Sequence, residues 1–152
     1  MIKGISDFFT QMIAPAASAS GEASQHALQV ATAALLLEMM RMDSTVTAAE
    51  TATVANALRE RFGLAVQDVD RLMALAAEQA QQATDYFQFT SLINKNFSRE
   101  QKIQVVEYLW QVAFADSHLD AHEQHFMRKI ADLLYISHAD YIAAKQRARG
   151  TS

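Results

Sequence analysis

The sequence predicts an all-α fold, a compact bundle of about seven to eight helices, and three observations lead to this prediction. Residue types with high helix propensity, such as Ala, Leu, Gln, Glu, Met and Arg, are abundant. Four glycines and one proline in 152 residues leave few positions where the backbone is forced to turn. Apolar residues recur at three- and four-residue steps, and no segment keeps the alternation of a β-strand long enough to count.

Length, charge and cysteine content narrow the classes of function. The chain is long enough to bury the core of one domain, and 51% of its residues are hydrophobic. Its net charge of −4 gives no electrostatic reason to expect nucleic-acid binding. The absence of cysteine excludes disulfides and thiolate chemistry and suits the cytoplasm. We expect neither export nor a transmembrane helix, because the longest apolar run, from Ala31, stops at Glu38.

The chain begins with an amphipathic segment and a linker, residues 1–23, followed by a helical domain, residues 24–152. The segment has apolar residues at helical spacing up to Ile13 and ends before Pro15. Packing on the core is the first interpretation. The alternative is a membrane-surface anchor formed by Ile5, Phe8 and Phe9, although Lys3 alone offers little attraction to anionic lipid.

Three helices are expected in the first half of the domain. Residues 24–42 are apolar over so wide an arc that the helix must be covered on both sides. The next helix starts at Thr47, whose spacing from Glu50 is that of a capping box, and ends before Gly63. The third helix covers about 67–83.

The second half repeats this order after a short helical connector, 85–97. Ser98 and Gln101 predict a capping box that opens a second central helix through Phe114. Asp120 and Glu123 predict the cap of the following helix. The last helix starts at Ser137 and runs to about residue 149, where its basic side chains suit a solvated helix end.

An internal repeat relates the two halves. The segments 40–50 and 113–123 align with identical spacing, so that Asp43 pairs with Asp116 and Glu50 with Glu123. After a shift of one residue, the repeat continues with further pairs: Val54 with Phe126, Leu58 with Ile130, Phe62 with Leu134, and Asp68 with Asp140. Such a duplication predicts two pseudo-symmetric helix–loop–helix halves whose long helices meet in the middle.

The second segment, Ala115-Asp-Ser-His-Leu-Asp-Ala-His-Glu-Gln-His-Phe-Met-Arg-Lys-Ile, resembles the tellurite-resistance TerB-like family, whose pattern is an alanine–aspartate loop followed by a Glu-headed helix. The resemblance spans roughly residues 25–149. The first segment departs from the pattern, with Met42 before Asp43 and Thr47 where an acid would stand. The resemblance implies an all-helical cytoplasmic domain linked to tellurite or other stress responses. It also implies a metal-binding or scaffold role near the membrane, with no established enzymatic activity.

The repeated acidic segments supply the candidate site. Their carboxylates are hard oxygen ligands of the kind that Ca²⁺ or Mg²⁺ takes. The candidate ligands are Asp43, Glu50, Asp116, Asp120 and Glu123. Each segment is too short and too poor in acids to surround a cation alone, so a site would have to be shared between the halves. The alternative is that these acids only cap helices, where negative charge is favourable without a metal.

Other chemistries have weaker support in the sequence. His118, His122 and His125 cluster around the second segment, but their spacing is not that of a zinc hydrolase helix, and we interpret them as exposed polar residues. The chain also lacks a glycine-flanked serine and phosphate-binding glycine loops. We expect no enzymatic activity and no cofactor beyond a divalent cation.

The sequence therefore predicts a non-catalytic binding or scaffold protein of a stress response, with protein partners engaged through an acidic face. Two alternatives stay open. One is a small hydrolase or lyase that uses the same carboxylates, which would require one of them to have a raised pKa in a pocket. The other is an adaptor that docks on a membrane through residues 1–13.

Overall fold

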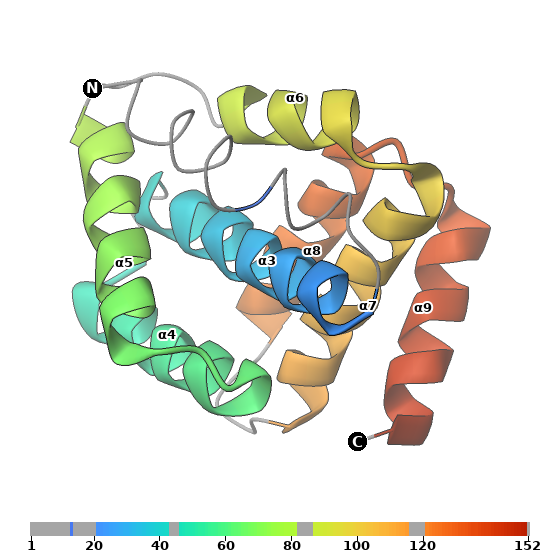
Figure 1. Ribbon diagram of the computed structural model, residues 1–152, viewed down its shortest axis with the longest axis horizontal. Helices are drawn as coiled ribbons and strands as arrows, with labels where there is room; N and C mark the ends of the chain where they lie inside the picture. Colours follow the sequence, from blue (N-terminus) through green and yellow to red (C-terminus); the bar gives the residue numbers. More distant parts are fainter. Residues whose placement is uncertain (1–12, 14–20, 43–45, 82–86, 116–120, 152) are drawn as a thin grey trace.

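The computed structural model describes residues 13, 21–42, 46–81, 87–115 and 121–151, and these form an all-α fold (Figure 1). No strand occurs within these ranges, which confirms the predicted fold class. The helices are α3 (Glu22–Met42), α4 (Ala48–Phe62), α5 (Val66–Gln81), α6 (Phe87–Asn96), α7 (Arg99–Ala115), α8 (Ala121–Leu133) and α9 (His138–Thr151). The predicted helix boundaries agree with these to within about two residues.

Helix α3 is the centre of the molecule. Figure 1 shows it running through the middle, with α4 and α5 on one side and α7, α8 and α9 on the other. From Ala27 to Met40 every residue is buried except Gln29, which is partly exposed. A helix that is apolar all round is stable only when other helices cover it. The other helices are therefore arranged around α3.

The helix contacts have the pseudo-symmetry that the repeat predicts. Helix α3 packs against α4 and α5, and α7 packs in the same way against α8 and α9. The two central helices touch each other, and each also touches the first flanking helix of the opposite half, α3 with α8 and α7 with α4. The repeat pairs Val54 with Phe126 and Leu58 with Ile130, and all four side chains are buried in one core. Equivalent residues of the two halves are therefore both packed in the core.

The helix starts follow the predicted capping chemistry. At α4 the Thr47 backbone N–H donates to Glu50 Oε1 at 2.8 Å, and the Glu50 N–H donates to Thr47 Oγ1 at 3.1 Å. The same reciprocal pair links Ser98 and Gln101 at α7, at 2.8 and 3.2 Å. These bonds satisfy backbone N–H groups that have no partner inside the helix. The predicted Asp120 cap lies outside the described residues.

Helices α4 and α8 end in the same motif with different residues. Gly63 has a φ of +64°, and the next N–H, of Leu64, donates to the Arg59 carbonyl at 3.0 Å. At the equivalent place Tyr135 has a φ of +60°, and the Ile136 N–H donates to the Ala131 carbonyl at 2.9 Å. Glycine adopts this left-handed conformation without steric cost, whereas tyrosine does not. The second half thus keeps the left-handed turn although Tyr135 disfavours a positive φ.

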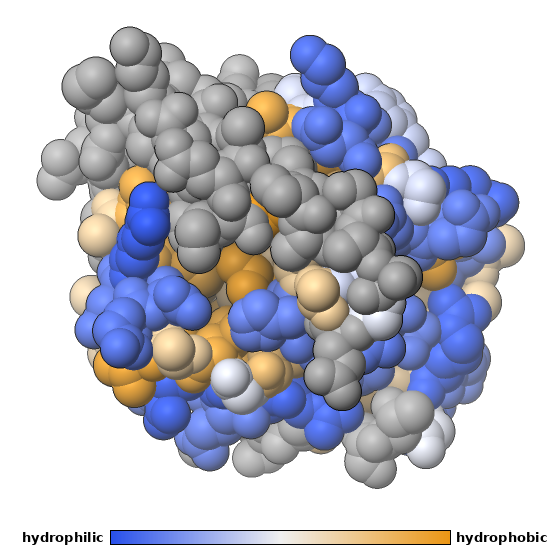
Figure 2. Space-filling view, in the orientation of Figure 1, coloured by the Kyte–Doolittle hydropathy of each residue, from blue (hydrophilic) through white to orange (hydrophobic). Residues whose placement is uncertain are grey.

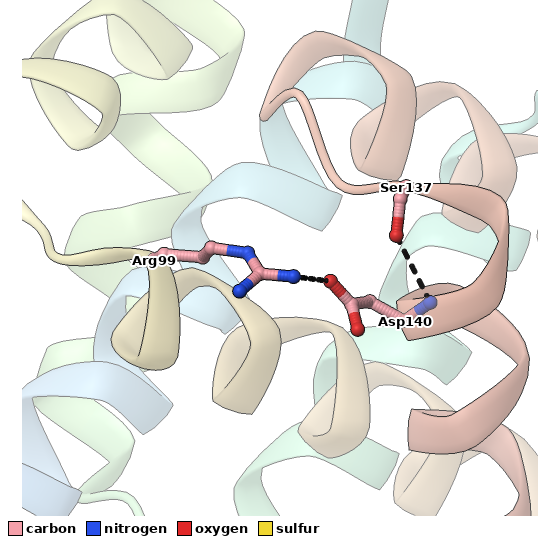
Figure 3. Close-up of polar contacts among 3 residues, drawn as sticks. All are labelled: Arg99, Ser137 and Asp140. Atoms are coloured by element: carbon pink, nitrogen blue, oxygen red, sulfur yellow. Dashed lines mark hydrogen bonds and ion pairs between the residues drawn. The ribbon is translucent and has the colours of Figure 1, made fainter.

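Two ion pairs hold α9 against α7. Near the start of α9, the Arg99 guanidinium contacts the Asp140 carboxylate, and the Asp140 N–H is capped by Ser137 Oγ (Figure 3). Towards its end, Arg147 Nε donates to Glu107 Oε1 at 2.7 Å. These exposed pairs each contribute little stability, but together they fix how α9 is rotated about its axis.

The predicted amphipathic segment of residues 1–13 is described only at Ile13, which is fully buried in the core. Ile5, Phe8 and Phe9 lie outside the described residues, as does the predicted linker up to residue 20. None of the helices that the structure describes is long and apolar enough to cross a membrane. Figure 2 shows hydrophilic residues over the outer face of α9, and apolar residues gathered where α3, α4 and α5 meet.

Replacing Gly63 by alanine should lower the free energy of unfolding by about 1 kcal/mol, because a Cβ at a positive φ is strained. Space is not the cause, since a Cβ built at Gly63 meets no atom within 4 Å. Gly150→Ala is the matched control, because Gly150 also has open space around it but an ordinary helical backbone. Urea unfolding measures both variants, and equal stability changes would contradict the explanation.

Candidate functional site

Of the predicted acidic ligands, the structure describes the side chain of Glu50. It is exposed on the first turn of α4, where one carboxylate oxygen is used in the capping box with Thr47. The other oxygen has no hydrogen bond to any residue in the described ranges. Asp43, Asp116 and Asp120 lie outside the described residues, and Glu123 is in α8 with its side chain not described. The shared cation site therefore stays a prediction.

The predicted histidine cluster is described at one position. His125 is exposed on α8, and its ring lies 6.1 Å from that of Phe126. His118 lies outside the described residues, and the side chain of His122 is likewise not described. Within the described part of the chain, no three His, Asp or Glu side chains come together in a group that could hold a metal ion.

A buried carboxyl group that the sequence analysis did not select lies on α3. Glu38 is 1% exposed, and neither of its side-chain oxygens has a hydrogen-bond partner among the described residues. Burial in the apolar core raises the pKa of Glu38 from 4.5 to about 8, because a charged carboxylate is poorly solvated there. The group therefore holds its proton at neutral pH. Its signal in the sequence was a single acid at the end of the apolar run from Ala31.

This raised pKa does not by itself make Glu38 a catalytic acid. A general acid or base must come within hydrogen-bond reach of its substrate, and the side chain of Glu38 is sealed from solvent. The residue is also not one of the carboxylates in the predicted acidic set. Its clearest consequence is for stability, since an unpaired polar group in the core opposes folding.

The second half contains a cleft of about 320 Å³ between α7, α8 and α9. Its lining combines aromatic rings with cationic and imidazole side chains: Trp110, His125, Arg128, His138, Tyr141, Ile142 and Lys145. Trp110 and Tyr141 are buried, whereas Arg128 and both histidines are exposed. The rings therefore lie at the bottom of the cleft, and the polar groups surround its opening.

Contacts between these side chains order the cleft. The rings of Trp110 and Tyr141 are 5.5 Å apart, and the ring of His138 lies 6.5 Å from that of Tyr141. The Lys145 ammonium sits 4.9 Å from the centre of the Trp110 ring, within the range of a cation–π interaction. The tail was expected to be a solvated basic end, but Lys145 packs on this ring and Arg149 lies 5.5 Å over that of Phe114.

The sequence analysis missed the cleft, although its spacing was visible. Positions 138, 141, 142 and 145 lie on one face of α9, and positions 125 and 128 are one turn apart on α8. This signal could have identified a mixed aromatic and cationic face on each helix. It could not have shown that both faces meet at Trp110.

Comparison with protein families gives one match that covers most of the chain. The model described as tellurite resistance protein TerB matches residues 29–146. The chain belongs to the TerB family. This confirms the resemblance inferred from the second acidic segment, and it links the chain to tellurite resistance at the level of the family. Comparisons with curated proteins and with solved structures gave no match. The TerB match includes both acidic segments, Glu38 and the whole cleft.

Glu38 should make the stability of this TerB protein fall as the pH rises. Below about pH 4.5 the group is protonated in both the folded and the unfolded state. Between 4.5 and about 8 the unfolded chain releases the proton that the folded chain keeps, so rising pH favours unfolding. In this range Glu38 should lower the free energy of unfolding by up to about 1.4 kcal/mol for each pH unit. Above about pH 8 its contribution to the pH dependence should vanish.

The test compares the unmodified chain with Glu38→Met, which has similar volume and no titratable group. In urea unfolding, the free energy of unfolding of Glu38→Met minus that of the unmodified chain should be larger at about pH 7.5 than at about pH 5. Glu60→Gln, at an exposed position of α4, is the control and should keep the pH dependence of the unmodified chain. Parallel pH profiles for Glu38→Met and the unmodified chain would refute the assignment.

Proposed function

We propose that this TerB-family chain is a non-catalytic binding protein of a cytoplasmic stress response, which takes up a divalent cation through its two acidic segments. The observation that carries the proposal is the duplication itself. Asp43 and Glu50 have the same spacing as Asp116 and Glu123. In each half the first acid follows the last residue of the central helix in the sequence, and the second lies in the first turn of the next helix. Carboxylates are the ligands that Ca²⁺ and Mg²⁺ prefer.

The described structure supports the proposal at Glu50. Its side chain is exposed, and the capping box fixes one oxygen and leaves the other without a hydrogen bond to a described residue. A carboxylate that is already oriented loses less conformational entropy on binding a cation than a free side chain does. Negative charge is also favourable at the positive start of the helix dipole, where Glu50 lies.

The hydrolase or lyase alternative has less support. It requires a carboxylate of the acidic segments with a raised pKa beside a pocket. Among the carboxylates whose side chains the structure describes, the raised pKa belongs to Glu38, which is sealed in the core. A binding role needs only exposed acids. On this proposal the acidic face, with its cation bound, engages a protein partner, either in the cytoplasm or at the membrane surface.

Isothermal titration of the metal-free full chain with Ca²⁺, Mg²⁺ and Mn²⁺ tests the proposal. We expect saturable binding of at least one cation. Because neither segment has enough ligands alone, Asp43→Asn and Asp116→Asn should each weaken binding about tenfold. Asp70→Asn removes an exposed acid of α5 and should leave binding unchanged. No heat at millimolar cation, or equal binding by all variants, would rule out the cation site.

A further inference from the structure

The cleft between α7, α8 and α9 concentrates positive charge in a protein whose net charge is −4. Two other basic side chains of α7 and α9 are paired with acids, since Arg99 contacts Asp140 and Arg147 contacts Glu107. Arg128 and Lys145, which line the cleft, form no ion pair within the described part of the chain. Two cationic side chains therefore line the cleft without a carboxylate partner among the described residues.

The carboxylate of Asp132 acts electrostatically on one lining residue of the cleft, Tyr141. Burial raises the pKa of the Tyr141 hydroxyl above its ordinary value of 10, Arg128 lowers it, and Asp132 raises it. Both charged groups therefore act at the hydroxyl from α8. Tyr141 remains a neutral O–H donor at neutral pH, and so adds a hydrogen-bond donor to a cleft that already has the guanidinium of Arg128.

The first half of the chain has a different set of residues at the positions equivalent to the lining of the cleft. Extending the pairing of the two halves assigns an equivalent in the first half to each lining residue of the cleft. In the order in which the lining residues were given, from Trp110 to Lys145, the equivalents are Leu37, Thr53, Asn56, Val66, Val69, Asp70 and Met73. None of them is a cation, a histidine or an aromatic residue. The first half packs the equivalent helices with apolar and neutral polar side chains and one acid. Trp110 and Tyr141 belong to the core, but the cationic and histidine side chains of the cleft exceed what packing demands.

We propose that this cleft binds a small organic anion with a flat apolar body, such as an aromatic carboxylate. Its volume of about 320 Å³ is at the small end of the range of ligand pockets, which excludes large ligands. Ile142, which is exposed, and the small exposed parts of Trp110 and Tyr141 provide the apolar surface for the body of the ligand. Arg128 and Lys145 provide charge for the carboxylate, and Arg can bind it through two parallel N–H bonds.

The two histidines complete the recognition of an anion. His125 lies one turn before Arg128 on α8, and His138 stands at the start of α9 with its ring close to that of Tyr141. An imidazole presents at least one N–H donor in either tautomer, so both residues can donate to a ligand oxygen. None of the lining residues belongs to the predicted acidic set, so this site is independent of the proposed cation site.

Fluorescence titration can follow the cleft directly, because Trp110 is the single tryptophan of the chain and lies in it. Benzoate is the probe, benzyl alcohol has a similar body without charge, and inorganic phosphate has charge without an apolar body. Benzoate should change the Trp110 emission saturably, with a roughly millimolar dissociation constant. Benzyl alcohol and phosphate should each bind at least about tenfold more weakly.

Variants locate the binding. Arg128→Gln and Lys145→Gln should each weaken benzoate binding about five- to tenfold, whereas Lys95→Gln, an exposed lysine of α6, should not. Line broadening of the benzoate proton NMR signals gives a second readout that does not depend on Trp110 emission. No saturable change with benzoate, equal binding of benzyl alcohol or phosphate, or unchanged binding in both cleft variants would overturn the proposal.

Discussion

The fold depends on one constraint, that the long helix α3 has no solvent-facing side and must be buried against α7 and under the flanking helices. In α3 the apolar surface extends around the whole helix, so partners are needed in every direction. The duplicated unit meets this need because α4 and α5 cover α3, α8 and α9 cover α7, and each central helix also contacts the first flanking helix of the other half. Burial of the centre thus fixes the positions of α4, α5, α8 and α9 around it.

Most of the fold could be predicted because its signals are local. The capping boxes of Thr47 and Ser98 depend on residues three positions apart, and the left-handed turn at Gly63 depends on one residue. The buried stripes follow from helical periodicity alone. Tyr135 shows where local signals fail, because the equivalent turn is kept there without glycine. Leu64 and Ile136 directly follow the two turn residues and are buried in the core, and their packing stabilises both turns.

The cleft could not be predicted because it is assembled from three helices. Lys145 and Trp110 are far apart in the sequence, and nothing local distinguishes a lysine that lies over an indole from one that points into solvent. The ion pairs of Arg99 and Arg147 bring α9 into place, and they too join distant residues. The comparison of the two halves nevertheless distinguishes packing residues from cleft residues. Where the halves agree, residues such as Leu58 and Ile130 serve the core; where they differ, as at Met73 and Lys145, the second half has a charged side chain that lines the cleft.

Glu38 is explained by the same comparison. Its equivalent on α7 is Gln111, which is partly exposed and accepts a hydrogen bond from Arg61 Nη2 of α4 at 3.4 Å. The residue of α8 that corresponds to Arg61 is the apolar Leu133, so the hydrogen bond of Gln111 has no counterpart in the other half, and Glu38 has no hydrogen-bond partner among the described residues. A carboxylate without a cation is costly in the core, and burial favours the protonated form of the group. Glu38 therefore couples the stability of the centre that holds the two halves together to pH.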